Sequence, residues 1–139
     1  MEDLKTKKAE IRKSTLARRD GLSKKERTEK SKAILSRLSE FANFLEARIV
    51  LFYKSHKSEV DTGPMIKRAF QMEKIVALPL IDQEKGEIVP LKIYDLKQDT
   101  QPGYRGIPEP NPQRCKQIPV EHINLAIIPG IAFDERGGR

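Results

Sequence analysis

The C-terminal residues of this chain are suited to bind phosphate. The apolar run Leu125–Ile128 is followed by Pro129 and Gly130, and then by a polar stretch that ends in Gly138 and Arg139. Glycines leave backbone N–H groups accessible, and a guanidinium can pair with phosphate oxygens. In open α/β sheets ligands bind beyond the carboxyl ends of the strands, so we expect this loop to border a ligand site. Because no helix follows the loop, we also expect the chain to be C-terminally truncated.

A second group of cations lies near the other end of the chain. Lys8 and Arg12 are four residues apart, so both lie on one face of the predicted first helix, where they could grip adjacent phosphate oxygens. Residues 1–32 contain twelve Lys or Arg and six Asp or Glu, which gives +6 of the net charge of +7. Such a basic segment suits a nucleotide or a nucleic acid, and the alternative is a solvated helical face.

A carboxylate follows the first predicted strand. Glu59 could accept hydrogen bonds from the ring N–H or amino group of a heterocycle. Alternatively, Glu59 and Asp61 only favour the N-terminus of the next helix electrostatically. In a later loop, Tyr104 between two glycines could cover a flat ring, or the loop could be ordinary surface. Cys115 has no neighbouring base, which predicts an inert or exposed thiol.

The elements that must position these residues follow from periodicity and from turn signals. We predict three helices, at residues 3–20, 24–45 and 63–72. A C′ glycine, Gly21, ends the first helix, a Ser23–Glu26 capping box opens the second, and Thr62 caps the third. We predict strands at 48–53, 74–79, 87–94 and 125–128, the third at a sheet edge, and a long irregular loop at 96–122. The apolar stripe of the second helix is Ile34, Leu38, Phe41 and Leu45.

The order strand, helix, strand over residues 48–79 indicates a βαβ unit and hence parallel pairing. We therefore predict one α/β domain over residues 1–139, with a helical segment at 1–46 and a sheet-containing part at 47–139.

Composition excludes several classes of protein. Apolar residues make up 37% of the chain and charged residues 34%, and no apolar run approaches the roughly 20 residues of a membrane helix. The start of the chain does not resemble a secretory signal, and a single cysteine excludes an internal disulfide. Two distant histidines offer no spacing for a metal site. We therefore expect a cytoplasmic protein without a dedicated metal cluster.

Five short motifs occur in order along the chain. They are Lys-x-x-x-Arg at Lys8 and Arg12, Arg-x-x-Leu-Ser at 19–23, Glu-Val-x-Thr at 59–62, Gly-x-x-Glu-Pro at 106–110, and Pro-Gly-x-Ala-Phe-Asp-x-x-Gly-x-Arg at 129–139. Together they resemble the 5-formyltetrahydrofolate cyclo-ligase family, also called methenyltetrahydrofolate synthetases. The resemblance covers the whole chain, and its last motif is the most specific.

This resemblance implies a Rossmann-like three-layer fold with a mostly parallel sheet, and an enzyme that uses ATP and Mg²⁺. The enzyme would convert 5-formyltetrahydrofolate into 5,10-methenyltetrahydrofolate, with release of ADP and phosphate. The formyl oxygen would attack the γ-phosphate, and N10 of the folate would then close the ring. The resemblance assigns ATP binding to Lys8, Arg12, Gly138 and Arg139, and substrate binding to Tyr53, Lys54 and Glu59. It implies a monomer that binds a small-molecule substrate and neither nucleic acid nor membrane.

One departure from the family pattern bears on activity. The family continues after the arginine with Leu-Gly-x-Gly-Lys-Gly-Tyr-Tyr-Asp, its main phosphate loop, which the 139 residues do not contain. We therefore expect this chain to bind ATP poorly and to have little cyclo-ligase activity. Two alternatives stay open from the residues alone: a nucleic-acid-binding module that uses the basic N-terminal helices, and an ATP-independent enzyme such as a sugar-phosphate isomerase or a CoA-transferase-like protein.

Overall fold

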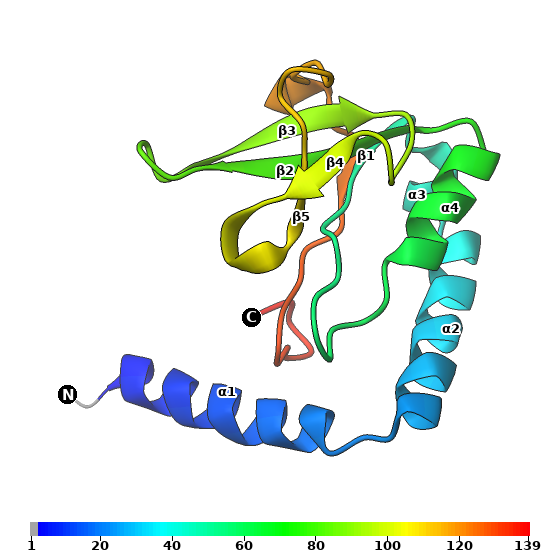
Figure 1. Cartoon of the computed structure of the whole chain (residues 1–139). Coiled ribbons are helices and arrows are strands. Elements are labelled where there is room, and N and C mark those ends of the chain that lie inside the picture. Colours follow the sequence, from blue (N-terminus) through cyan, green and yellow to red (C-terminus); the bar gives the residue numbers. More distant parts are fainter. Residues whose placement is uncertain (1–2) are drawn as a thin grey trace.

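The computed structural model describes residues 3–139, which begin with three helices (Figure 1). These are α1 (Leu4–Asp20), α2 (Lys24–Glu40) and α3 (Ala42–Glu46). The predicted capping box opens α2, since the Ser23 hydroxyl accepts from the Glu26 N–H while the Glu26 carboxylate accepts from the Ser23 N–H. Gly21 ends α1 as predicted, but its φ is −77°, so the predicted left-handed C′ conformation is wrong.

The predicted helix 24–45 is broken at Phe41, which is extended with ψ of 122°. The break changes which residues face the core: Phe44 is fully buried, and Leu35 and Leu38 pack against the core cluster. Ile34, Phe41 and Leu45 of the predicted stripe are about half exposed. The stripe fails at Phe41 and Leu45 because the bend resets the direction of every later side chain. Ile34 precedes the bend and is half exposed because Leu35 and Leu38 face the core instead.

The sheet has the strand order β3-β2-β1-β6. Its strands are β1 (Ile49–Leu51), β2 (Ile75–Asp82), β3 (Glu87–Ile93) and β6 (Leu125–Ala126). β1 pairs in parallel with both β2 and β6, and β3 pairs antiparallel with β2 at the edge, as its internal Pro90 predicted. The crossover from β1 to β2 contains α4 (Gly63–Gln71), so the predicted βαβ unit is confirmed. The α/β fold with a mostly parallel sheet is therefore confirmed.

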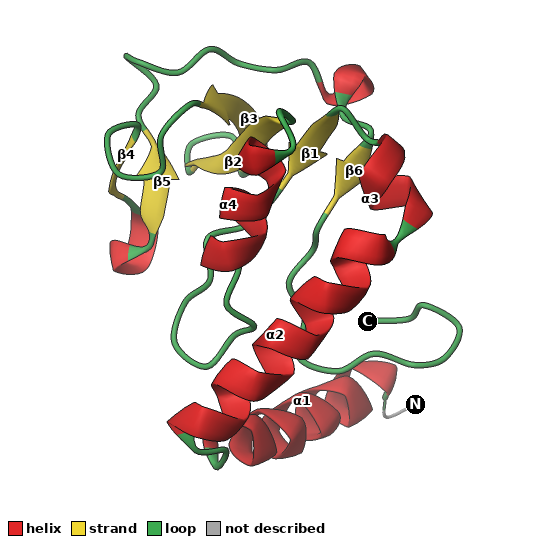
Figure 2. Ribbon diagram, turned by 90° about the vertical axis from the view of Figure 1, so that its right-hand side faces the viewer, coloured by secondary structure: helices red, strands yellow, loops and turns green. Residues whose placement is uncertain are grey.

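The core lies between one face of this sheet and the helices, which Figure 2 shows on one side of the strands. Val50, Val76 and Leu78 alternate with residues of the opposite face, and Met65 and Ile66 of α4 meet them. The opposite face is more open near the β2–β3 turn, where the paired Ile81 and Ile88 are 40% and 63% exposed. Residues 3–139 thus supply two of the three predicted layers, the sheet and one helical layer.

The region predicted as a long irregular loop contains secondary structure of its own. β4 (Thr100–Pro102) and β5 (Pro108–Pro110) form a two-stranded antiparallel sheet around the 3₁₀ turn η1 (Tyr104–Gly106), and a second 3₁₀ turn, η2 (Val120–His122), precedes β6. Proline-rich strands of three residues carry too little periodicity to be recognised from sequence. Within the described part of the chain, no helix combines the length and apolar character that crossing a membrane requires.

Candidate active site at the carboxyl edge of the sheet

Two segments leave the same edge of the sheet because β1 and β6 are parallel neighbours. The chain after β1 runs through residues 52–62, and the chain after β6 runs to Arg139. The Ile127 N–H donates to the Leu51 carbonyl at 2.8 Å, which keeps the two segments together where they leave the sheet. In Figure 1 both segments hang from the sheet toward α1. A site bordered by both loops is the arrangement expected beyond the carboxyl ends of parallel strands.

Tyr53 and Glu59, two of the predicted substrate residues, are close together in the first of these segments. The Tyr53 hydroxyl donates to the Val60 carbonyl at 3.5 Å, and the Glu59 carboxylate accepts from the His56 N–H at 2.8 Å. Burial and then the negative charge of Glu59 raise the pKa of Tyr53, and the nearby Arg19 partly opposes them. Tyr53 therefore stays neutral at physiological pH. Lys54, the third predicted substrate residue, is half-buried beside them.

Thr62 closes this segment, but it does not cap α4 as predicted. Its hydroxyl donates to the Tyr53 carbonyl at 2.8 Å and accepts from the Ser55 N–H at 3.0 Å. The Asp61 carboxylate instead accepts from the Gly63 N–H at 3.0 Å. Thr62 is fully buried, so it fixes residues 53–62 as a closed loop in which Glu59 has a defined position.

A polar cluster that the sequence analysis did not assign joins this loop to α1. The Arg19 Nε donates to the Ser58 hydroxyl at 3.0 Å, and that hydroxyl donates to the Asp20 carboxylate. Ser58 is 6% exposed. Arg19 stood in the Arg-x-x-Leu-Ser motif, but nothing local in the sequence indicates that its partner lies 39 residues away.

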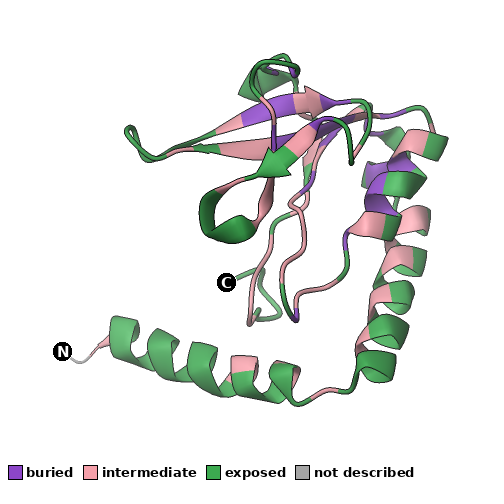
Figure 3. Ribbon diagram, viewed as in Figure 1, coloured by how far each residue is buried: buried purple, intermediate pink, exposed green. Residues whose placement is uncertain are grey.

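Lys8 and Arg12 lie on α1 with their side chains exposed to solvent. α1 has no buried residue, and Figure 3 shows it as almost entirely exposed. Among residues 3–139, no hydrogen bond or ion pair joins Lys8 or Arg12 to the C-terminal loop. Both cations are therefore free to meet an anion, and their role in ATP binding stays a prediction.

The C-terminal loop is a closed turn around Asp134. The Asp134 carboxylate accepts from the Arg136 N–H at 2.8 Å and from the Gly138 N–H at 2.6 Å. A Cβ at Gly138 would lie 2.4 Å from this carboxylate, so a larger residue there would have to displace the Asp134 side chain. The expectation of bare N–H groups at Gly138 is therefore wrong, because a carboxylate of the same loop occupies that donor.

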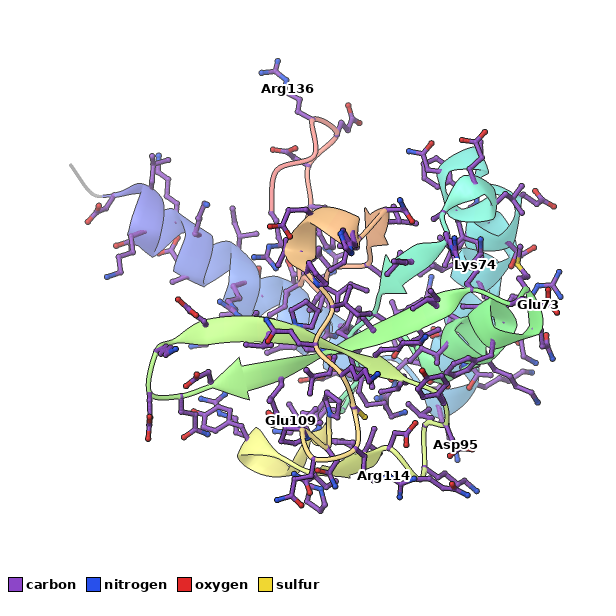
Figure 4. All side chains as sticks on the ribbon, turned by 90° about the horizontal axis from the view of Figure 1, so that it is seen from above. Glu73, Lys74, Asp95, Glu109, Arg114 and Arg136 are labelled. Carbon is purple, nitrogen blue, oxygen red and sulfur yellow. The ribbon has the colours of Figure 1, made fainter. Side chains whose placement is uncertain are left out.

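The two arginines of this loop point in different directions. Arg139 folds back, and its guanidinium donates to the Pro129 carbonyl at 2.7 Å. Arg136 projects outward from the tip of the loop (Figure 4). Arg139 is thus the cation of this loop that lies nearer to the sheet edge.

The other candidate residues lie away from this edge. Tyr104 is 44% exposed on η1, and the Arg105 guanidinium lies 5.1 Å from its ring centre. Cys115 is 5% exposed, and burial, followed by the charge of Asp99, raises the pKa of its thiol. An inert Cys115 thiol, the first of the two predicted possibilities, thus fits its surroundings, whereas the prediction of an exposed thiol is wrong.

Nucleotide phosphates fit the cations Lys8, Arg12 and Arg139 by charge. Among the described residues, no group of three or more His, Cys, Asp or Glu side chains is arranged to hold a metal ion. A magnesium ion that enters with nucleotide needs only one or two carboxylates beyond phosphate oxygens and water. Asp134 and Glu135, both exposed, are the carboxylates of this loop that could supply one.

The fold and this edge are those of an α/β protein with cations and a carboxylate beyond its parallel strands. The model of the 5-formyltetrahydrofolate cyclo-ligase family matches residues 4–139. The chain belongs to that family, as the ordered motifs predicted.

Individual relatives agree. The 5-formyltetrahydrofolate cyclo-ligase of Escherichia coli K12 is 25% identical over 88% of this chain and 67% of its own length. A probable 5-formyltetrahydrofolate cyclo-ligase of Caenorhabditis elegans is 27% identical over 100% of this chain and 69% of its own. The solution structure of Aquifex aeolicus 5,10-methenyltetrahydrofolate synthetase superposes with a TM-score of 0.79 at 30% identity, over 91% of this chain and 62% of that one. The chain therefore spans about two thirds of the relatives that it matches.

Proposed function

We propose that this chain binds 5-formyltetrahydrofolate and MgATP at the carboxyl edge of the sheet and serves the ATP-dependent formation of 5,10-methenyltetrahydrofolate. The observation that carries the proposal is the closed 53–62 loop, which holds Glu59 beside Tyr53 in a member of the cyclo-ligase family. ADP and phosphate are the other products.

Glu59 is the proposed ligand of the pterin ring. One of its oxygens accepts from the His56 N–H, which fixes the carboxylate, and the other has no hydrogen-bond partner among residues 3–139. That free oxygen can accept from a ring N–H or an amino group of the pterin. The neutral Tyr53 supplies an aromatic surface beside it, and Lys54 completes this side of the pocket.

Lys8, Arg12 and Arg139 are the proposed ligands of the ATP phosphates. The proposed reaction transfers the γ-phosphoryl group to the formyl oxygen, which becomes a good leaving group when N10 of the folate attacks. Transfer of this kind is accelerated mainly by positioning and by charge neutralisation. Cations from two separate segments can provide both, and Mg²⁺, when bound, neutralises further phosphate charge.

Glu59→Gln tests the substrate half of the proposal. We expect it to weaken 5-formyltetrahydrofolate binding, measured by isothermal titration calorimetry, by about tenfold or more, because a charged acceptor becomes a neutral one. Asp61→Asn is the matched control, since this carboxylate of the same loop already accepts from the Gly63 N–H, and we expect less than a threefold change. Equal affinities of Glu59→Gln and the unaltered protein would contradict the assignment.

An absorbance assay for methenyltetrahydrofolate tests the reaction class. The proposal requires that product formation depend on both ATP and Mg²⁺. Product that forms at the same rate without ATP would refute it and would favour an ATP-independent enzyme on the same fold.

A further inference from the structure

A cavity of about 490 Å³ lies between α2 and the loop after β1. Its size falls within the usual range for small-molecule sites. Figure 1 shows α2 on one side of this loop and the C-terminal loop on the other. The cavity is therefore on the α2 side, away from the cations assigned to ATP.

The cavity is lined by more positive than negative charge. Lys24, Arg27 and Lys32 of α2 and Lys57 of the loop contribute four cations, against the two carboxylates of Glu59 and Asp61. Both carboxylates already accept N–H groups of their own loop, those of His56 and Gly63. The one ion pair found within residues 3–139 joins Arg114 to Asp99, so no carboxylate lies within ion-pair distance of the four cations.

Arg27 carries an unsatisfied donor at this cavity. Its Nε is buried and is the one buried side-chain nitrogen or oxygen in the described residues without a hydrogen-bond partner. A buried donor of a charged group that lacks a partner is costly, and native proteins rarely retain one. Because Arg27 also lines the cavity, the outer Nη groups of its guanidinium are the donors that a ligand oxygen can reach.

The cations are spaced along the cavity wall. Lys24 and Lys32 are eight residues apart on one helix, which corresponds to roughly 12 Å at 1.5 Å per residue. Arg27 lies between them, with the Ser31 hydroxyl one turn further on, where it accepts from the Asp61 N–H at 3.1 Å. A ligand with several negative groups along its length matches this row better than a single ion does.

We propose that the cavity between α2 and the loop after β1 binds a small polyanion through phosphate or carboxylate oxygens, with the Arg27 guanidinium as the central donor. This site is additional to the folate and ATP sites proposed above, and it shares with them only Glu59, which also lines the cavity. The proposal does not depend on the cyclo-ligase reaction.

Calorimetric titration with tripolyphosphate and, separately, with citrate tests the site and distinguishes phosphate from carboxylate. We expect at least one of the two to bind, and to bind more weakly at high salt. Arg27→Lys retains the charge but removes the planar guanidinium donors, and we expect it to weaken binding about tenfold. Lys57→Gln, an exposed change on the opposite wall, should weaken binding several-fold without affecting the fold.

Lys8→Gln is the control, because tripolyphosphate could also bind at α1. The proposal predicts that the anion still binds to the α2 cavity in this variant, with less than a twofold change in that Kd, whether or not a separate site at α1 is lost. If Lys8→Gln abolishes binding while Arg27→Lys and Lys57→Gln do not, the anion binds at α1 and the proposal is overturned. It is equally overturned if neither probe binds to the folded protein.

Discussion

Ser58 is the residue on which the position of α1 depends. Through Ser58, α1 makes its only side-chain hydrogen bonds to another part of the described chain, from Arg19 Nε at 3.0 Å and to the Asp20 carboxylate. Because α1 has no buried residue, little else holds it. Lys8 and Arg12 lie on this helix, so their distance from the sheet edge depends on the same contact.

We predict that Ser58→Ala releases α1 from the loop after β1. Each lost hydrogen bond has a charged partner and would contribute about 1.5–3 kcal/mol if it were buried. Because Arg19 and Asp20 are partly or fully exposed, we expect the two bonds together to contribute about 1–2 kcal/mol to the docking of α1. This value corresponds to about a tenfold change in the equilibrium between docked and released α1. A free helix of this length is marginal in water, so release should also unravel it. The global free energy of unfolding should fall by no more than this value of about 1–2 kcal/mol, because the core is untouched.

Hydrogen exchange measured by mass spectrometry tests this prediction directly. We expect protection of residues 4–20 to fall about tenfold in Ser58→Ala, with peptides of β2 unchanged, and the Kd for MgATP to rise. Ser14→Ala is the matched control, since its hydroxyl donates only to the Ile11 carbonyl within α1, at 3.2 Å. Unchanged exchange of α1 in Ser58→Ala, or an equal change in both variants, would refute the reasoning.

Three further predictions concern stability. Asp99 is buried, and the N–H groups of Tyr94 and Asp95 are the main reason that its pKa is lowered. A lowered carboxyl pKa gives a stabilisation that is fully present above about pH 4 and is lost as the pH falls through the pKa of the folded state. In urea titrations Asp99→Asn should therefore be less stable at pH 7 by about 2–3 kcal/mol, and should lose less stability on acidification. Lys74 donates to the Leu45 and Ala47 carbonyls at 3.1 and 2.6 Å and lies over the Phe44 ring. Lys74→Met should therefore lower the free energy of unfolding in urea by about 2 kcal/mol. Lys67→Met, an exposed change on α4, should change it little. Glu73 has φ of +59° between α4 and β2, so Glu73→Gly should be neutral or raise the melting temperature by a few degrees, and a fall of more than a few degrees would show that its side chain matters more than its backbone.

The residues that sequence reasoning placed correctly belong to patterns among near neighbours. The capping box at Ser23 and Glu26 spans three residues, and the edge strand was indicated by Pro90 within an alternating run. The βαβ unit followed from an amphipathic helix between two apolar strands, because few connections between such strands are sterically accessible. The ordered motifs also identified the family, since each is local.

The residues whose contacts the sequence did not predict bond to distant parts of the chain, or to one of several possible partners nearby. Thr62 was expected to cap α4, but the Tyr53 carbonyl and the Ser55 N–H are better placed to use its buried hydroxyl. The N–H of Gly138 was expected to be free, but Asp134 of the same turn reaches it first. A propensity describes which bond a residue can make, and only the path of the chain decides which partner is nearest.

The sequence by itself determined the α/β class, the parallel βαβ unit, the family and which residues are candidates for binding, because these depend on composition, periodicity and local motifs. Tertiary structure decided that Ser58 holds α1, that Asp134 fills the C-terminal turn and that Arg27 lines a cationic cavity. Ser58 and Arg27 meet segments that are distant in the sequence, whereas the Asp134 contacts depend on the conformation of one turn. Their energies depend on burial and distance, which are properties of the folded chain.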